Sequence, residues 1–178
     1  IETANINKKN YPNKKIKFVT MDNLNMKFPN NLFDIITARH TIIDAKQIYN
    51  FLANKGILII EGVDKYDCWE LKTLFNRGQA FNDNISISQK DYNDLKEAGF
   101  SEINLQEIVQ YEYYKTDNDL LALLLKTPIL DDFSELDTLS NTHKNQIEVD
   151  LFNQYISQHT TDKGIELKRV LYGIVAKK

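Results

Sequence analysis

The chain has 178 residues, about the length of one domain, and its 42% hydrophobic and 26% charged residues are ordinary for a globular protein. This excludes a disordered, collagen-like or low-complexity chain. No run approaches the roughly 18–20 apolar residues that cross a bilayer, so we expect no membrane association. The net charge of −3 gives no support for general binding to nucleic acids.

Cysteine and histidine are scarce. The single cysteine, Cys68, cannot form an internal disulfide, and it fits a reducing, cytoplasmic location. His143 and His159 have no spacing to each other or to carboxylates that suggests a metal ligand set. We therefore expect no metal site.

The first strands are predicted before residue 40. Residues 1–10 resemble the end of a surface helix, and residues 16–20 predict a short strand with apolar Ile16, Phe18 and Val19. A loop rich in Asp, Asn and Pro follows. Residues 33–38 predict a second strand, apolar on both faces, as expected when helices cover both sides of a parallel sheet.

A helix and a third strand come next. Asp44 is a good N-cap for a helix through about Ala53, which Gly56 ends by supplying a left-handed conformation. Residues 57–60 form the most apolar strand. Strands and helices that alternate through short links indicate an open α/β sheet, because parallel neighbours need a crossover helix.

The second half continues as one domain without repeats or linkers. It predicts a helix over 67–75, a helix from Ser88 to about Ala98 closed by Gly99, a strand over 101–109, a leucine-rich helix from Asp117 to Thr127-Pro128, a polar segment over 131–145 that is loop or helix, a helix over 147–157 and a last strand over 169–176.

The order of these features resembles class I S-adenosylmethionine-dependent methyltransferases. The resemblance rests on a strand followed by Met21-Asp22-Asn23, Phe28-Pro29, Phe33 to Ile36, Ala38-Arg39-His40 and Leu52 to Ile60. It implies an α/β, Rossmann-like methyltransferase sheet, mostly parallel with an antiparallel final strand. Residues 1–178 would form strands three to seven of the family fold, with 111–163 as a cap or insertion.

Two diagnostic features of the family are missing. The chain has no glycine before Gly56, so it lacks the glycine-rich turn after strand one, and it lacks the acidic residue that ends strand two. We therefore expect an N-terminally truncated domain that lacks about 60–70 residues, or two strand–helix units. The alternative is that this unit folds alone or with another chain.

Ligands of open α/β sheets bind beyond the carboxyl ends of the strands. There the resemblance implies S-adenosylmethionine as cofactor, bound by Met21, Asp22, Asn23, Ala38, Arg39 and His40. Asp22 would accept a hydrogen bond from the adenine amino group, or it is an ordinary loop aspartate. His40 is the candidate catalytic base, and Arg39 would hold an acidic group of the substrate or form a structural ion pair.

Glu61, Tyr113 and Tyr114 are the candidate substrate contacts. Glu61 follows the third strand, where it would face the substrate or cap a nearby helix. The tyrosines would stack on a flat acceptor or pack along an edge strand. We expect residues 111–128 to cover the cleft as a lid, with Tyr113 or Tyr114 facing the acceptor; the competing interpretation makes the leucines a dimer interface.

The leading hypothesis is therefore a methyltransferase for a small or medium-sized acceptor, incomplete as given. Alternatives are a non-catalytic binding or assembly subunit with the same fold, and an RNA methyltransferase. A dehydrogenase is disfavoured because no glycine loop for phosphates is present. The missing motifs also predict that this chain alone binds S-adenosylmethionine weakly or not at all.

Overall fold

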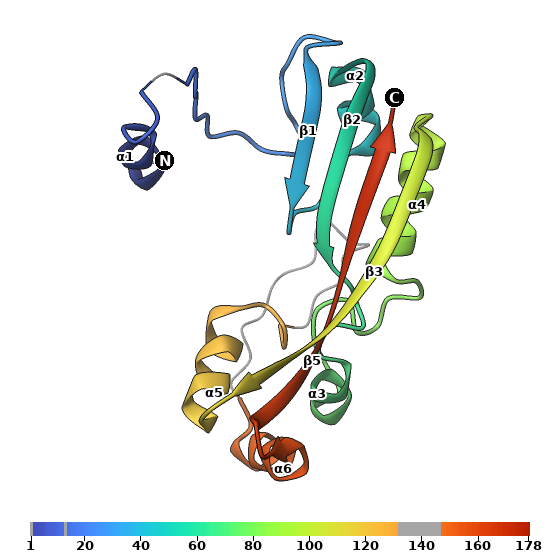
Figure 1. The fold of residues 1–178 in the computed structure, drawn as a ribbon. Helices are drawn as coiled ribbons and strands as arrows, with labels where there is room; N and C mark the ends of the chain where they lie inside the picture. Colours follow the sequence, from blue (N-terminus) through green and yellow to red (C-terminus); the bar gives the residue numbers. More distant parts are fainter. Residues whose placement is uncertain (1, 13, 132–146) are drawn as a thin grey trace.

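The computed structural model describes residues 2–12, 14–131 and 147–178, so most of the polar segment 131–145 lies outside the described residues. Figure 1 shows an upper sheet with helices behind it and two long strands that run down to a group of helices. The elements in chain order are α1 (Glu2–Lys8), β1 (Phe33–Arg39), α2 (Ala45–Phe51), β2 (Leu52–Val63), α3 (Trp69–Phe75), α4 (Ile87–Ala98), β3 (Ser101–Tyr114), α5 (Asp117–Lys126), α6 (Val149–His159), β4 (Thr160–Thr161) and β5 (Gly164–Lys177).

The sheet is mixed, and the prediction of a mostly parallel sheet is wrong. Its order is β1-β2-β5-β3, with β4 beside β5. β1 and β2 pair in parallel, whereas β2, β3 and β4 each pair with β5 in antiparallel fashion. β1, β2 and β3 do run in the same direction. Because the reversed final strand lies between β2 and β3, it makes every pairing but one antiparallel.

Residues 16–20 do not form the predicted strand. They form no regular secondary structure, and Phe18 and Val19 are exposed. A strand is stabilised by a hydrogen-bonded neighbour, and within the described residues this segment pairs with no strand, not even along the outer edge of β1. The helix α1 lies apart from the sheet, beyond the edge of β1 (Figure 1).

The N-cap of α2 is confirmed, but its end differs from the prediction. The Asp44 side chain accepts a hydrogen bond from the Gln47 amide, and the helix stops at Phe51. Lys55, with φ +66°, takes the left-handed conformation that we assigned to Gly56. Glycine is favoured at position 56 for another reason: a Cβ there would lie 2.9 Å from the carbonyl oxygen of Ala53.

The helices of the second half lie where the sequence predicts them, with shifted boundaries. The cap of α4 is Ser86 and not Ser88, and Gly99 closes it with φ +101° as expected. α5 begins with a capping box between Thr116 and Asp119. β3 and β5 extend well beyond the predicted strands 101–109 and 169–176, because they pair with each other over most of their length.

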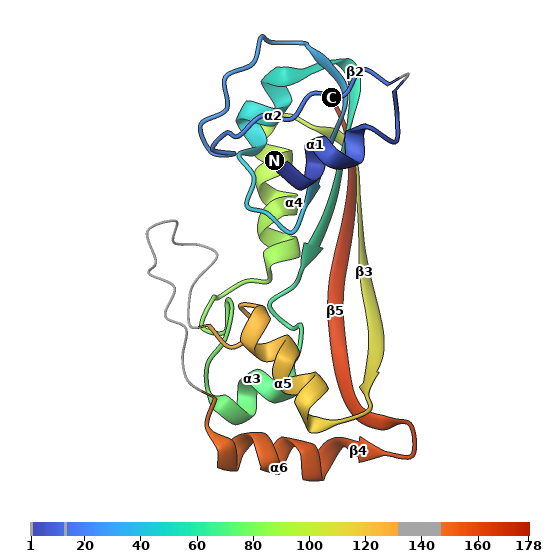
Figure 2. The ribbon, with the colours of Figure 1, turned by 90° about the vertical axis from the view of Figure 1, so that its left-hand side faces the viewer.

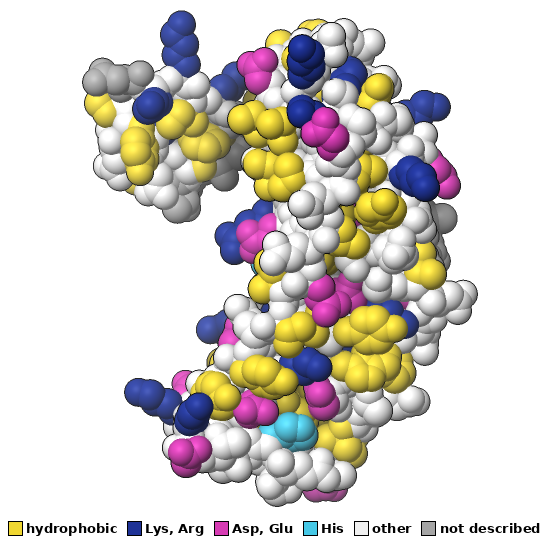
Figure 3. All heavy atoms as spheres, turned by 45° about the vertical axis from the view of Figure 1, so that its right-hand side comes forward, with side chains coloured by type: hydrophobic (Ala, Val, Ile, Leu, Met, Phe, Trp, Pro, Cys, Tyr) yellow, Lys and Arg dark blue, Asp and Glu magenta, His cyan; other side chains and the backbone are white. Residues whose placement is uncertain are grey.

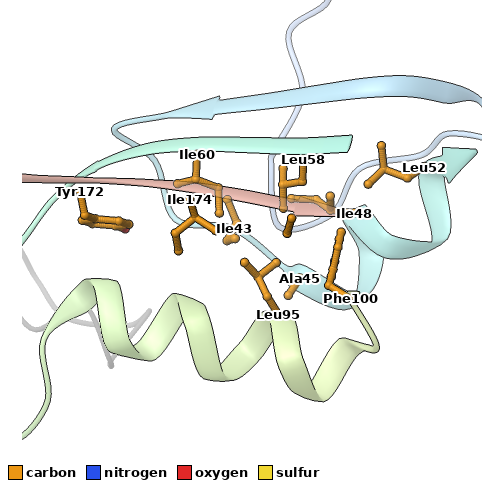
Figure 4. Close-up of a cluster of buried hydrophobic side chains, with 11 residues drawn as sticks. Ile43, Ala45, Ile48, Leu52, Leu58, Ile60, Leu95, Phe100, Tyr172 and Ile174 are labelled. Atoms are coloured by element: carbon orange, nitrogen blue, oxygen red, sulfur yellow. The ribbon is translucent and has the colours of Figure 1, made fainter. Parts of the chain in front are cut away.

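One hydrophobic cluster, called the upper cluster below, lies on one face of the sheet. Its buried members are Ile43, Ala45, Ile48, Leu52, Leu58, Ile60, Leu95, Phe100, Tyr172, Ile174 and Ala176. Figure 2 shows α2 and α4 on the same side of the strands, and Figure 4 shows Leu95 of α4 pointing toward Ile174 of β5. The opposite face exposes Ile35, Ile59 and Val175. Among the described residues no helix packs over these three side chains, so the expectation of helices on both faces is wrong.

A second hydrophobic cluster, called the lower cluster below, joins α3, α5 and α6 to the lower ends of the long strands (Figure 1). Its buried members are Cys68, Leu71, Phe75, Leu120, Leu124, Ile129, Leu130, Phe152, Tyr155, Ile165 and Leu167. Leu120 and Leu124 are buried in it, so the leucine-rich helix packs within its own chain. Cys68 is a core residue here. Burial, and then the neighbouring Asp67 carboxylate, raise the pKa of its thiol, which therefore stays protonated at neutral pH.

None of the described helices has both the length and the apolarity to traverse a membrane.

Candidate functional site

Arg39, His40 and Glu61 meet at the carboxyl ends of β1 and β2, as predicted. The parallel register places Arg39 beside Glu61. The Glu61 carboxylate lies 3.2 Å from Nε of Arg39 and 3.5 Å from Nε2 of His40. His40 has φ +48°, and its backbone N–H donates to the Glu61 carbonyl oxygen at 2.9 Å. The backbone thus turns away from the direction of β1 at His40, and the imidazole lies next to the Glu61 carboxylate.

The loop with Asp22 and Asn23 is fastened beside this cluster. The side-chain amide of Asn23 donates to Oγ1 of Thr41 at 2.7 Å, directly after His40 in sequence. Asp22 accepts from the Leu24 amide at 2.9 Å, and its side chain remains exposed. The loop is thus held by its own turn and by contacts to the end of β1.

The remaining predicted cofactor residues lie on either side of this loop. Met21 precedes it and is exposed. Ala38 is partly buried and packs against the upper cluster, so its side chain faces away from Arg39 and Glu61. The structure therefore brings Asp22, Asn23 and the Arg39–His40 end of β1 together, with Ala38 behind them.

Tyr113 and Tyr114 lie elsewhere. Tyr113 pairs with Glu166 on β5, and its hydroxyl donates to the Glu166 carboxylate at 3.0 Å. Glu61 is opposite Gly173 on the same strand. The stretch of β5 between these two partners spans about 23 Å at 3.3 Å per residue. Neither tyrosine lines the cleft described next, and their proposed contact with an acceptor stays a prediction.

A cleft of about 490 Å³ opens beside His40, between the upper and lower hydrophobic clusters. Its size is within the usual range for a small-molecule site. The polar groups that line it belong to His40, Thr41, Asp67, Gln79, Thr127 and Arg169. The other walls are formed by Gly62, Ile42, Val63, Ile87, Leu123, Pro128, Ile129 and Tyr172. Leu123 of α5 and Pro128, which follows the helix, thus line the cleft in the place where we expected the tyrosines.

Two of the lining residues, Asp67 and Arg169, belong to an ion-pair network. Arg169 donates to both oxygens of Asp67, from Nε at 2.9 Å and from Nη2 at 3.1 Å. Its Nη1 donates to Glu112 at 3.1 Å. Burial alone would lower the pKa of Arg169, but the hydrogen bonds and charge of Asp67 outweigh it and raise that pKa. The guanidinium is therefore always charged and paired.

The sequence analysis did not identify Asp67 and Arg169 as site residues. We placed Asp67 at the start of a helix, and it instead precedes α3 with its side chain buried. One signal could have found this site, because Arg169 is the only charged residue of the predicted final strand 169–176. A charged side chain in such a strand is retained when it has a partner, here Asp67.

Gly62 is held in contact with an aromatic ring. A Cβ at this position would overlap the ring of Tyr172, whose hydroxyl donates to buried Asp91 at 2.6 Å. We expect Gly62→Ala to lower the free energy of unfolding by about 1–3 kcal/mol. The Tyr172 ring is held by the backbone of β5 at one end and by the hydrogen bond to Asp91 at the other, and the new methyl group would force it to shift. Urea unfolding of the variant measures this cost.

Two further variants show whether the overlap is the cause. Gly173→Ala is the matched control, because a Cβ there would meet only the carbonyl oxygen of Ile60, at 3.8 Å. In a Tyr172→Leu background the cost of Gly62→Ala should shrink, since the ring is gone. An unchanged cost in that background would contradict the explanation.

Charged side chains do not gather by sign on the face shown in Figure 3. Basic and acidic groups alternate there with apolar and neutral ones.

Within residues 2–12, 14–131 and 147–178, no three His, Cys, Asp or Glu side chains come together as metal ligands would. His159 is half-buried, stacked on Tyr155 at 3.9 Å, while His143 lies outside the described residues.

Solved structures share this fold. The chain aligns over 99% of its length with 78% of a protein from Bacillus halodurans C-125 provisionally described as a methyltransferase, at 13% identity and a TM-score of 0.56. It aligns over its whole length with 77% of the YcgJ protein from Bacillus subtilis, at 13% identity and a TM-score of 0.59. A SAM-dependent methyltransferase from Archaeoglobus fulgidus matches 84% of the chain, at 15% identity and a TM-score of 0.41, over 61% of its own length.

No protein-family model and no curated protein matches the sequence. The fold shared with the Bacillus halodurans protein nevertheless confirms, at the level of the fold, the methyltransferase resemblance inferred from the order of the motifs. At these identities the likeness defines the fold class: a mixed α/β sheet of the methyltransferase type.

Proposed function

We propose that the protein takes part in S-adenosylmethionine-dependent methyl transfer to a small or medium-sized acceptor. The observation that carries this proposal is the meeting of Arg39, His40 and Glu61 beside a cleft, at the carboxyl ends of β1 and β2. In open α/β sheets this is where ligands bind. The methyltransferase-like fold supports the choice of reaction.

The adenine end of the cofactor fits the residues present. The exposed Asp22 carboxylate accepts one hydrogen bond, from Leu24, and a carboxylate has further acceptor sites for an amino group. Asn23 fits less well, because its side-chain amide already donates to Thr41. Its part is to hold the loop. For the methionine end, no glycine precedes Gly56 to form the turn that approaches it.

Bound S-adenosylmethionine would supply an electrophilic methyl group. The chain's own contribution is to align the acceptor and, where the attacking atom carries a proton, to remove it. His40 lines the cleft, and it would take that proton. Glu61 would hold the imidazole through the 3.5 Å contact, while Arg39 balances the charge of Glu61.

Binding of S-adenosylhomocysteine, followed by amide chemical shifts, tests the cofactor site. We expect shifts in residues 21–24 and 39–41, even if binding is weak. Asp22→Ala should reduce the affinity about ten- to hundredfold, because a hydrogen bond to a charged acceptor contributes about 1.5–3 kcal/mol.

Asp34→Ala is the control, because Asp34 is also an exposed aspartate but lies within β1. It should leave the affinity unchanged. Shifts confined to other parts of the chain, or equal affinity of the Asp22→Ala and wild-type proteins, would count against the assignment. The absence of any shift at saturating ligand would remove the cofactor site from this chain.

A further inference from the structure

The two oppositely charged side chains that line the cleft, Asp67 and Arg169, are paired with each other. Asp67 is 1% exposed and Arg169 is 15% exposed at the side chain, and the two form a two-pronged ion pair. Asp67 also accepts from the backbone N–H of Val170 at 2.8 Å. The third member, Glu112, is bound by Arg169 through both of its oxygens.

The rest of the lining is uncharged or lies at the mouth. Leu123, Ile129 and Tyr172 present apolar surface, and Thr127 and Gln79 are neutral. The Thr127 hydroxyl donates to the Leu123 carbonyl oxygen at 2.8 Å, so its hydrogen is already used. The other charged pair near the cleft, Arg39 with Glu61, lies at its rim, where the Arg39 side chain is 72% exposed and is screened by water.

We propose that the cleft binds an uncharged molecule with an apolar body and at most a few hydrogen-bonding groups. A charged ligand would lose its hydration without meeting an unpaired counter-charge, because Asp67 and Arg169 already satisfy each other. That this molecule is the methyl acceptor rests on the proposed function. The binding preference itself rests only on the cleft.

Three probes of one size test this preference. Benzamide, benzoate and benzylamine share a ring and are neutral, anionic and cationic at pH 7. We expect saturation-transfer NMR at millimolar concentration to detect benzamide, with both ions binding about tenfold more weakly or not at all. Contacts from the benzamide ring to the methyl groups of Leu123 and Ile129 should place it in the cleft without any variant.

Two variants on one helix confirm the location. Leu123→Trp should fill the cleft and weaken benzamide binding about tenfold or more. Leu125→Trp is the control, because Leu125 is exposed on the same helix, and it should bind like the wild type. If Leu123→Trp does not fold, the methyl contacts of the wild-type protein decide the location.

Several outcomes would overturn the proposal. They are equal or tighter binding of benzoate or benzylamine, benzamide contacts away from Leu123 and Ile129, unchanged binding by a folded Leu123→Trp variant, and no binding of benzamide. The titrations contain no S-adenosyl compound, so their result is independent of the cofactor test. Benzamide binding without S-adenosylhomocysteine binding would keep the neutral-ligand cleft and reject its role in methyl transfer.

Discussion

Replacing Arg169 with methionine is expected to lower the free energy of unfolding by about 3–5 kcal/mol. The substitution keeps much of the side-chain volume but removes the cation that pairs with Asp67. Asp67 would then remain as a buried carboxylate that accepts only from the Val170 N–H and, weakly, from the Cys68 thiol among the described residues. Breaking one side of a buried pair is costly because the remaining charge has lost both water and its partner. Urea unfolding of wild type and variant measures the difference.

Arg39→Met is the matched control for this prediction. It removes the same kind of side chain from an arginine–glutamate pair, but Arg39 is 72% exposed and Glu61 is 45% exposed. We expect it to cost at most about 1 kcal/mol, because water solvates the charge that is left. Similar costs for the two variants would mean that the Asp67–Arg169 pair is as well hydrated as a surface pair.

Leu120→Ala is expected to lower the free energy of unfolding by about 2–5 kcal/mol. Leu120 is 0% exposed and lies in the cluster that joins α3, α5 and α6 to the long strands. Truncation removes apolar contacts and leaves a cavity that the neighbouring side chains fill only in part. Chemical unfolding, followed by circular dichroism, measures the loss.

The same helix supplies the comparison, because Leu125 is 58% exposed. Leu125→Ala should change the stability by no more than about 0.5 kcal/mol. Equal losses at both positions would indicate that α5 does not pack as described, or that its outer face is covered by another molecule. The second outcome would revive the dimer interpretation of the leucines.

These two predictions concern the parts that build the cleft. Arg169 lines it, and so does Leu123 of α5. The upper cluster holds the ends of β1 and β2, and the lower cluster holds α5. A loss of packing in the lower cluster should therefore weaken ligand binding in the cleft, even though Leu120 does not line it.

Local signals in the sequence determined much of the first half of the fold. Asp44 predicted the start of α2 because a carboxylate beside free backbone N–H groups stabilises that end wherever the helix packs. The apolar run 57–60 predicted the central strand. The positions of Arg39, His40 and Glu61 followed as well, because neighbouring parallel strands end at the same edge of the sheet.

The tertiary structure decided what depends on distant neighbours. Whether residues 16–20 become a strand is set by the presence of a pairing partner, which local propensity does not encode. The insertion of β5 between β2 and β3 made the sheet mixed. The long β3–β5 pairing places Tyr113 beside Glu166, at the opposite end of β5 from the residues that pair with the end of β2. The Asp67–Arg169 pair joins residues 102 positions apart. Only the packing of both clusters brings such residues together, and so the sequence predicted the rim of the site while the fold created its interior.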